Sequence, residues 1–304
     1  MREDGAVTSA TEQPESPAMD SLAMNRPAAG SGAPAAVRLI ATDLDGTLLR
    51  DDKTVSERTV AALAAAERAG IEVFFVTGRP ARWMGVVSEH VHGHGLAICG
   101  NGAAVVDLRD GGRLIDVRSL APVDALSVAA ALREAAPGVS FAVDRSSGVH
   151  YEPGYPPFQF EPGATIAPVE KLLADGNEYA HHPILKLLAH HPEMAPDAFL
   201  ELARSIAGHH ATFTRSSPTA LLEISGLGVS KASTLARCCA ERGIAPAEVV
   251  AFGDMPNDLE MLSWAGTSYA MGNAHPAVLA ATTHRTETNY EDGVAVVIER
   301  ILAG

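Results

Sequence analysis

Four short apolar runs in this sequence are each followed at once by glycine and polar residues. They cover residues 37–42, 71–76, 96–99 and 249–253. A run of this length bounded by turn residues is typical of a strand that is buried on both faces. Such strands occur mainly in parallel sheets that helices cover on both sides. The runs therefore predict an α/β protein.

Helical segments lie between and after these runs. Ser56 is a suitable N-cap for a helix that Gly70 ends, and a second helix is expected from Ser230 to Arg242, closed by Gly243. A last helix is expected over residues 292–302. Strands that alternate with helices pair in parallel. We therefore expect a Rossmann-like, doubly wound parallel sheet to which both ends of the chain contribute.

Residues 120–224 have a different texture. An Ala-rich helix is predicted from Asp124 to Ala136, and a segment rich in Pro, Gly and aromatic residues follows at 151–168. The flanking segments, 37–119 and 225–304, complete each other as two halves of one sheet. Since the chain is long enough for two domains, we predict that the middle segment is an inserted α/β cap domain.

The N-terminal residues 1–36 contain four prolines and no aromatic residue. Such a segment buries too little apolar surface to offset its chain entropy. Acidic residues also interrupt any apolar run of the kind a secretory signal needs. We expect this segment to be a disordered extension.

The charge balance argues against several classes of protein. The chain has 23 Lys and Arg against 37 Asp and Glu, a net charge of −14 with His neutral, whereas a nucleic-acid binder needs a basic surface. No apolar run approaches the roughly 18 residues of a membrane helix, and three cysteines cannot form a disulfide framework. We therefore expect a cytoplasmic protein that binds neither nucleic acid nor a membrane, with an oligomeric state that the composition does not determine.

Two aspartates follow the first strand, in the sequence Asp43-Leu44-Asp45-Gly46-Thr47. Carboxylates this close raise each other's cost of ionising unless a cation or a proton lies between them. The pattern therefore indicates a metal site or a pair that shares acid and base roles. The alternative is a plain turn, since Asp-Gly is common in tight turns.

A second acidic cluster, Asp254 to Asp258, follows the last of the four strands and precedes a helix. Asp254 and Asp258 are four residues apart, so both can face one pocket once the helix begins. The alternative is that Asn257 or Asp258 only caps that helix. In open parallel sheets ligands collect at the carboxyl ends of the strands, and the residues that follow the four strands include Asp43, Thr77, Asn101 and Asp254.

An acidic rim repels phosphate unless cations are present. Lys231 stands at the start of a predicted helix, whose N-terminus adds partial positive charge. Thr77 and Gly78 offer a hydroxyl and an unobstructed backbone N–H for a phosphate oxygen. Taken by itself, Lys231 is better explained as a solvated surface lysine, and Thr77-Gly78 by itself is only a turn.

Four segments together resemble the motifs of the haloacid dehalogenase (HAD) superfamily of phosphatases: DLDGTLL at 43–49, VTGR at 76–79, GVSK at 228–231 and GDMPNDLEML at 253–262. With Asn101-Gly102-Ala103 and an insertion between the second and third motifs, the chain is similar to the Cof-type branch, subfamily IIB. The resemblance covers residues 37–304. One departure is Ala232, where the family often has Gly.

The resemblance implies a Mg²⁺-dependent phosphomonoester hydrolase that works through an aspartyl-phosphate. Asp43 would be the nucleophile, and Asp45 would protonate the leaving alkoxide and then activate water. Mg²⁺ would be held by the Asp43 carboxylate, the Asp45 backbone carbonyl and Asp254, with Asp258 orienting its water shell. Oxygen ligands and retained waters suit this ion.

The resemblance also implies which residues bind the phosphoryl group and the substrate. Lys231, Thr77 and the Gly78 amide would hold the phosphoryl oxygens, assisted by Asn257. Arg79 and Asn101 would reach toward the substrate or the cap, and Thr47 would brace the loop. For the last three residues a structural role is an equal alternative.

Relatives of this kind act on small phosphorylated metabolites, among them sugar phosphates and flavin or pyridoxal phosphates. A phosphosugar mutase shares the motifs and is one alternative. The other is a phosphometabolite sensor without turnover, against which the intact set of Asp43, Asp45, Lys231 and Asp254 argues.

Specificity would lie in the cap. Candidate substrate contacts there are Tyr155, Phe158, Arg215 and Ser216, although both aromatic residues are equally suited to a core. The histidine pairs of the chain have no metal-ligand spacing, so we expect them to lie on the surface.

Overall fold

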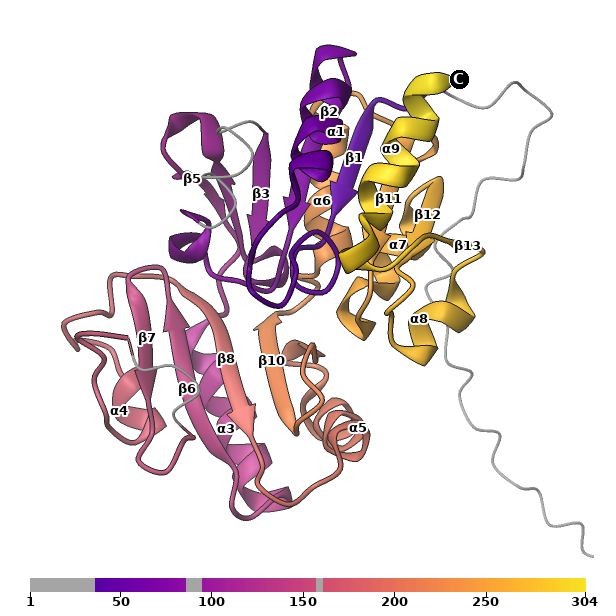
Figure 1. Cartoon of the computed structure of the whole chain (residues 1–304). Coiled ribbons are helices and arrows are strands. Elements are labelled where there is room, and N and C mark those ends of the chain that lie inside the picture. Colours follow the sequence, from indigo (N-terminus) through magenta and orange to yellow (C-terminus); the bar gives the residue numbers. More distant parts are fainter. Residues whose placement is uncertain (1–35, 86–94, 157–160) are drawn as a thin grey trace, which may run out of the picture. The chain divides into compact units, whose positions relative to one another are not determined.

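The computed structural model describes residues 36–85, 95–156 and 161–304 of the 304-residue chain. Two β-sheets, each with its own apolar core, make up this part of the chain (Figure 1). The extension predicted at residues 1–36 lies outside the described residues, apart from Ala36. Among the helices described, none has the length and apolar character to cross a membrane.

The first sheet has eight strands and combines the two ends of the described chain. Its strands, in spatial order, are β13 (His284–Arg285), β12 (Thr267–Ala270), β11 (Val249–Gly253), β1 (Leu39–Thr42), β2 (Glu72–Val76), β3 (Leu96–Cys99), β4 (Ala104–Asp107) and β5 (Arg113–Val117). All four predicted runs form strands of this sheet. Strands β13 to β3 pair in parallel, as expected.

Strands β4 and β5 depart from the predicted parallel sheet, because each pairs antiparallel with its neighbour. Only a short turn at Gly100–Gly102 separates β3 from β4. A connection of that length cannot hold the crossover that parallel pairing needs, so the chain reverses. The sheet is therefore mixed at this edge and parallel in its centre.

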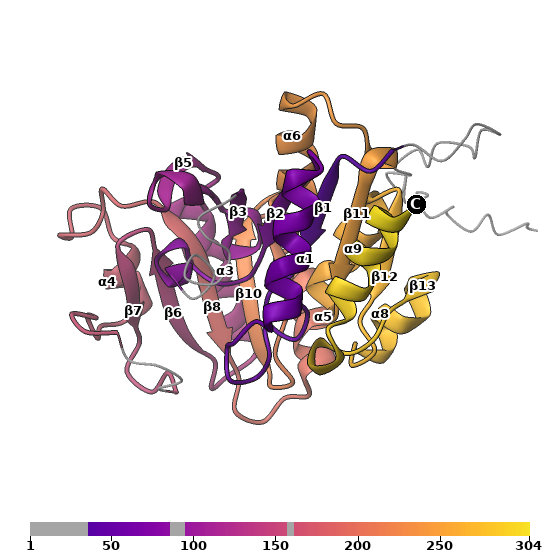
Figure 2. The same ribbon diagram turned by 45° about the horizontal axis from the view of Figure 1, so that its top comes forward.

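Helices cover both faces of the first sheet. They are α1 (Glu57–Arg68), α6 (Lys231–Glu241), α7 (Leu259–Trp264), α8 (Pro276–Ala281) and α9 (Gly293–Ala303). Figures 1 and 2 show α1 and α9 side by side in front of the strands, with α6 behind them. The Ser56 hydroxyl caps α1 through the N–H of Thr59, and Ser230 forms a capping box with Ser233 at the start of α6. Both predicted helix starts are confirmed.

The second sheet has five antiparallel strands. In spatial order they are β7 (Gly148–Tyr151), β6 (Ser140–Arg145), β8 (Ile184–His190), β10 (Leu221–Gly226) and β9 (Ala211–Thr214). Its helices are α3 (Pro122–Ala135), α4 (Val169–Leu173) and α5 (Pro196–Ala207). The helix predicted from Asp124 is α3, which begins two residues earlier because Pro122 suits the first helical turn.

Only one face of the second sheet is covered by these helices. Successive strand residues point to opposite faces, and one set packs with α3 and α5: Phe141, Val143, Leu187, Leu222 and Ile224. The alternate set includes Asp144, Lys186, Leu188, Leu221 and Glu223, which line a cavity instead. In chain order, all strands of this sheet follow α3, and β10 is the last of them. The division of the chain at residues 120 and 224 stays a prediction.

Candidate active site

A cavity of about 840 Å³ lies where the ends of β1 and β2 meet the open face of the second sheet. The loops after β1 and β2 line it through Asp43, Asp45, Thr77, Gly78 and Arg79, and Asn257 joins them from the segment after β11. Six of the sequence-predicted site residues therefore share one cavity wall. Their strand-end positions explain why, because parallel strands present their carboxyl ends at one edge.

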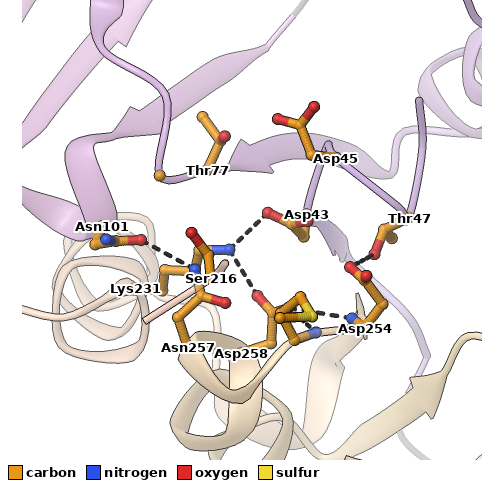
Figure 3. Close-up of polar contacts among 12 residues, drawn as sticks. Asp43, Asp45, Thr47, Thr77, Asn101, Ser216, Lys231, Asp254, Asn257 and Asp258 are labelled. Atoms are coloured by element: carbon orange, nitrogen blue, oxygen red, sulfur yellow. Dashed lines mark hydrogen bonds and ion pairs between the residues drawn. The ribbon is translucent and has the colours of Figure 1, made fainter. Parts of the chain in front are cut away.

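Lys231 is the buried centre of the polar contacts. Its Nζ donates to Oδ1 of Asp43 at 2.6 Å and to Oδ1 of Asp258 at 2.7 Å (Figure 3). The side chain is 1% exposed, so the alternative of a solvated surface lysine is wrong. The two carboxylates raise the pKa of Lys231 above its usual value although burial opposes them. The ammonium group is charged at any pH at which the protein functions.

Asp258 also organises the loop that carries Asp254. Its Oδ2 accepts the backbone N–H groups of Asp254 at 3.1 Å and of Met255 at 3.0 Å. A Cβ atom at Gly253 would lie 2.6 Å from Asp258, so only glycine fits there. The other carboxylate oxygen, Oδ1, accepts a hydrogen bond from Lys231. Asp258 therefore positions both Lys231 and the Asp254 loop, whereas the alternative left by the sequence was that it only caps a helix.

Asp254 is held from the opposite side by the turn after Asp43. The Thr47 hydroxyl donates to Oδ1 of Asp254 at 2.8 Å, as a bracing role for Thr47 requires. Gly46 has a φ of +80°, and a Cβ atom there would lie 2.3 Å from Oδ2 of Asp254. The glycine thus allows the close approach of the two loops.

The three carboxylates converge as a cation site would require. One oxygen each of Asp43, Asp254 and Asp258 lies within 4.8 Å of the others, and all three residues are buried. When ionised they exceed the charge of Lys231 by two negative charges. Hard carboxylate oxygens and this excess fit Mg²⁺. The residues present therefore suit the ion that the motifs imply.

The pKa values of the cluster reflect that excess charge. Burial and then the charge of Asp258 raise the pKa of Asp254 to about 7. Burial likewise raises the pKa of Asp43 well above its usual value, against the opposing charge of Lys231. Without a cation, the protein therefore binds a proton in this cluster at neutral pH more readily than ordinary aspartates do.

Asp45 has a separate environment. Arg79 grips it bidentately, Nε to Oδ2 at 2.6 Å and Nη2 to Oδ1 at 2.7 Å, and Lys53 Nζ donates to Oδ1 at 2.8 Å. Burial raises the pKa of Asp45, but these hydrogen bonds outweigh it and the pKa is lowered overall. Figure 3 shows its carboxylate pointing away from Lys231. The Arg79 guanidinium therefore binds Asp45.

Thr77 and Gly78 form the adjoining wall. The Thr77 hydroxyl accepts the backbone N–H of Arg79 at 3.0 Å, which shapes this turn. The Gly78 carbonyl accepts Nζ of Lys186, from β8, at 2.7 Å. Sequence reasoning placed both residues at a phosphate site, and the structure places them on the cavity beside Asp43.

Asn101 links three parts of the site. It adopts a left-handed backbone conformation, φ 56°, at the end of β3. Its Nδ2 donates to Oε2 of Glu223 at 2.8 Å, and its Oδ1 accepts Nδ2 of Asn257 at 3.2 Å. Among the residues described, nothing donates to the buried Oδ1 of Asn257. That orphaned acceptor can receive a donor from a bound molecule.

Sequence reasoning missed two residues of the second sheet, Lys186 and Glu223. Lys186 Nζ donates to Oε2 of Glu223 at 2.7 Å, and both side chains are buried. Ser216 also hydrogen-bonds to Glu223. Burial raises the pKa of Glu223, but Lys186 outweighs it and the pKa is lowered overall. The missed signal was a single charge in each of two apolar strands, ILKLLAH and LLEISG.

The predicted contacts in the insertion had mixed outcomes. Tyr155 and Ser216 line the cavity. Arg215 does not line it, because its guanidinium binds Asp197 and the carbonyl of Ser217. Phe158 lies outside the described residues. Among the histidines, the surface prediction is wrong for His191, whose ring is buried and accepts the N–H groups of two nearby residues.

This fold and site define a hydrolase with a buried aspartate cluster at the carboxyl edge of a parallel sheet. Residues 40–298 match the sequence profile of the haloacid dehalogenase-like hydrolases. The chain belongs to this family and is an enzyme, a phosphatase of the Cof type, as its motifs predicted.

Characterised relatives and solved structures agree with that assignment. The chain is 32% identical over 267 residues to the 5-amino-6-(5-phospho-D-ribitylamino)uracil phosphatase YitU of Bacillus subtilis, covering 84% of this chain and 94% of that protein. It is 29% identical to the HMP-PP phosphatase of Cronobacter sakazakii, covering 81% and 88%. The HAD-superfamily phosphatase BT1666 of Bacteroides thetaiotaomicron has the same fold, with a TM-score of 0.74, 22% identity and coverage of 88% and 96%.

Proposed function

We propose that the protein is a Mg²⁺-dependent phosphomonoester hydrolase that acts on small phosphorylated metabolites through an aspartyl-phosphate. The observation that carries this proposal is the buried cluster of Lys231, Asp43, Asp254 and Asp258 at the cavity wall. A carboxylate, a fixed ammonium group and an excess negative charge that suits a divalent cation are what phosphoryl transfer to a carboxylate requires.

In the first step, an Asp43 oxygen attacks phosphorus in line with the ester oxygen. A bond from Asp43 to phosphorus forms, the phosphorus–ester oxygen bond breaks, and the leaving alkoxide takes a proton from Asp45. Lys231 holds Asp43 by one oxygen and keeps it from turning away. Positioning of this kind supplies much of the rate in phosphoryl transfer.

In the second step, Asp45 accepts a proton from water, and the water oxygen attacks phosphorus. The bond to Asp43 breaks, inorganic phosphate leaves, and both carboxyl groups return to their starting states. The grip of Arg79 and Lys53 keeps Asp45 ionised in the ligand-free protein. Substrate binding therefore has to loosen this grip before Asp45 can serve as an acid.

The remaining residues hold the substrate. Asp43, Asp254 and the Asp45 carbonyl, with Asp258 behind them, would hold Mg²⁺, which would supply positive charge next to the phosphoryl group. Thr77, the Gly78 amide and Lys231 bind phosphoryl oxygens, and Asn257 adds its amide. Asn101 connects this site to Glu223 of the second sheet. Its effect on the substrate is therefore indirect, through its contact with Glu223.

Residues 120–224 act as the cap in this proposal. Three charged residues of the second sheet reach the loops of the first: Lys186 contacts Gly78, Glu223 contacts Asn101, and Asp144 contacts Arg82. A cap held in this way limits water at the site and selects the leaving group. The candidate substrates are sugar phosphates and flavin or pyridoxal phosphates.

The test is phosphate release from a panel of sugar, nucleotide and cofactor phosphates, measured with Mg²⁺ and with EDTA. The proposal predicts metal-dependent release from at least one ester. A phosphosugar mutase would instead give an isomerised ester without free phosphate. A sensor would bind an ester and change nothing, and either result would contradict the proposal.

A further inference from the structure

Lys186 and Glu223 make more contacts than an ion pair needs. Lys186 Nζ donates to Oε2 of Glu223 and to the Gly78 carbonyl, both at 2.7 Å. The same Oε2 accepts Nδ2 of Asn101 at 2.8 Å. Both charged residues are 5% exposed. Each charge therefore reaches one loop of the first sheet, Lys186 the loop after β2 and Glu223 the loop after β3.

The peptide group between Gly78 and Arg79 is held at both of its polar atoms. Its carbonyl oxygen accepts Lys186, and its N–H donates to the Thr77 hydroxyl at 3.0 Å. Glycine has more backbone freedom than any other residue, so without these two bonds the turn would be free to rotate. Lys186 therefore fixes the orientation of the turn that carries the Gly78 amide.

The hydrogen bonds that continue from Glu223 have a fixed direction. Burial raises the pKa of Glu223, but Lys186 outweighs it, and an ionised carboxylate only accepts hydrogen bonds. Asn101 must therefore present its Nδ2 to Glu223, which leaves its Oδ1 to accept Nδ2 of Asn257 at 3.2 Å. One N–H of Asn257 is used in this way, and the other can donate to a bound phosphoryl oxygen. The ion pair thus decides which atoms the two amides present.

Gly78 also packs closely against this chain of hydrogen bonds. A Cβ atom at Gly78 would lie 3.2 Å from Oε2 of Glu223 and 3.2 Å from Oδ1 of Asn101. Only a residue without a side chain allows the loop after β2 to approach these atoms so closely. Reorientation of one of the three groups would therefore disturb the other two.

The competing explanation is that the ion pair only ties the second sheet to the first. A buried ion pair is a weak tether, because the cost of removing two charges from water offsets much of their attraction, and apolar residues of similar volume often stabilise as well. Arg82 and Asp144 also connect the two sheets. A tether alone does not explain why the pair shares its atoms with Gly78 and Asn101, which adjoin the proposed phosphoryl site.

We propose that Lys186 and Glu223 are positioning residues for the phosphoryl site: they fix the Gly78 turn and set the hydrogen-bonding direction of Asn101 and Asn257. The inference rests on the proposed function. It gives neither charge a contact with the leaving group, so the pair acts on the part that all phosphomonoesters share. Loss of the pair should therefore lower kcat/KM by the same factor for every ester.

A double variant separates this role from a tether. Lys186→Met combined with Glu223→Met replaces the ion pair by apolar side chains, which should keep the Tm close to that of wild type. The Gly78 carbonyl and the amides of Asn101 and Asn257 then lose their fixed partners, and kcat/KM should fall by about 10–100-fold. A folded double variant with the kcat/KM of wild type would overturn the proposal.

Glu223→Gln should show the opposite combination. Lys186 can only donate, so the new amide turns its oxygen toward Lys186 and Asn101 and its nitrogen toward the Ser216 hydroxyl. The direction of the hydrogen bonds is kept, and kcat/KM should stay within about threefold of wild type. The Tm should fall, because Lys186 loses its buried counterion. A fall in kcat/KM as large as in the double variant would contradict the proposal.

Two esters with unlike leaving groups provide a second readout. Ribose 5-phosphate and p-nitrophenyl phosphate share only the phosphoryl group. In the double variant, the falls in kcat/KM for the two esters should agree within about threefold. A fall confined to one ester would mean that Lys186 or Glu223 contacts the leaving group, and it would overturn a positioning role.

Glu152→Gln is the matched control for the loss of a buried carboxylate. Glu152 is 6% exposed, pairs with Arg133 and accepts the backbone N–H groups of Phe141 and Val169. It is not among the described residues that line the cavity. The variant should lose stability, as Glu223→Gln does, and keep the kcat/KM of wild type for both esters. A fall in kcat/KM equal to that of the double variant would contradict a specific role for the Lys186–Glu223 pair.

Binding of inorganic phosphate separates the pair from turnover. Phosphate has no leaving group, so calorimetric titration in the presence of Mg²⁺ reports on the phosphoryl site alone. The double variant should bind phosphate about tenfold more weakly than wild type or worse, and Glu152→Gln should bind it as wild type does. If no ester releases phosphate, the hydrolase proposal fails and this measurement alone decides the positioning role. Equal affinities in wild type and the double variant, or no binding to wild type, would overturn it.

Discussion

At the residue scale, the charge of the site depends on Lys231. Three ionised carboxylates that are buried together repel one another. Lys231 offsets part of this repulsion, because its ammonium group contacts two of them at 2.6 and 2.7 Å. Breaking a buried pair leaves an uncompensated charge, which typically costs about 3–5 kcal/mol. The same contacts orient Asp43, so both the stability of the site and the position of the proposed nucleophile depend on this one side chain.

The turn between Asp43 and Thr47 offers a prediction at this scale. In Gly46→Ala, the new Cβ would meet Oδ2 of Asp254 at 2.3 Å, so the carboxylate must move and Mg²⁺ affinity should fall by about 10–100-fold. Titration of activity and of thermal stability with Mg²⁺ measures the effect.

Gly70→Ala is the control for backbone strain. Gly70 has a similar φ of +83°, but no heavy atom lies within 4 Å of the added Cβ. Both variants should lose about 1–2 kcal/mol of stability, because both place Ala in the left-handed region. Unchanged Mg²⁺ affinity in Gly46→Ala would show that Asp254 does not take part in metal binding.

At the element scale, helix α6 positions Lys231 because its N-terminus is fixed. The Ser230 hydroxyl accepts the backbone N–H of Ser233, and the Ser233 hydroxyl accepts the backbone N–H of Ser230. The Thr234 hydroxyl donates to the Gly102 carbonyl at 2.8 Å. Gly102 has a φ of +105°, and a Cβ there would lie 2.3 Å from the carbonyl oxygen of Ser230. The first turn of α6 therefore packs directly against the loop after β3.

Ser230→Ala tests whether the N-cap of α6 positions Lys231. Loss of the N-cap should cost about 1 kcal/mol of stability and, by shifting Lys231, lower kcat/KM by roughly tenfold. Ser56→Ala removes the equivalent cap of α1, away from the cavity, and should cost similar stability without the kinetic change. Urea unfolding and steady-state kinetics separate the two effects. Equal kinetics in both variants would contradict a positioning role for the α6 cap.

The element scale also shows what the sequence could predict. Strands β1, β2, β3 and β11 were predictable because each is a short apolar run that ends in glycine or polar residues. Helices α1 and α6 carry Ser N-caps that local sequence reveals. Antiparallel β4 and β5 were not predicted, since their pairing depends on a short turn with few local signals.

Candidate site residues could be predicted where they directly follow a strand or begin a helix. They were harder to predict where two side chains meet only after distant parts of the chain have packed together. Asp43, Lys231, Asp254 and Asp258 converge as predicted from their positions, although their catalytic roles stay predictions. The Lys186–Glu223 pair was missed. A lone charge in an apolar strand usually faces solvent, and only the docking of two sheets buries these two.

At the whole-molecule scale, we expect metal binding and folding to be linked through the acidic cluster. The folded pKa of Asp254 is about 7, above its unfolded value near 3.8. Between these pH values the folded state holds more protons than the unfolded state. This group therefore makes the metal-free protein less stable as the pH rises from about 4 to 7.

Mg²⁺ should reverse that loss, because binding requires the ionised carboxylates. We predict that the increase in Tm on adding Mg²⁺ is larger at pH 8 than at pH 5.5. Buried His150 and half-buried His190, whose pKa values desolvation lowers, titrate equally with and without the ion and cancel in this difference. Asp254→Asn should abolish most of the increase, and an increase that is the same at both pH values would contradict the linkage.

The central claim is that Asp43 carries the phosphoryl group. The most direct measurement is Mg²⁺-dependent phosphate release by Asp43→Asn beside wild type, on the best ester of the panel and with circular dichroism to confirm folding. We predict a fall in kcat of at least about 10³-fold in a variant that remains folded. Phosphate release at close to the wild-type rate by a folded Asp43→Asn protein would contradict it.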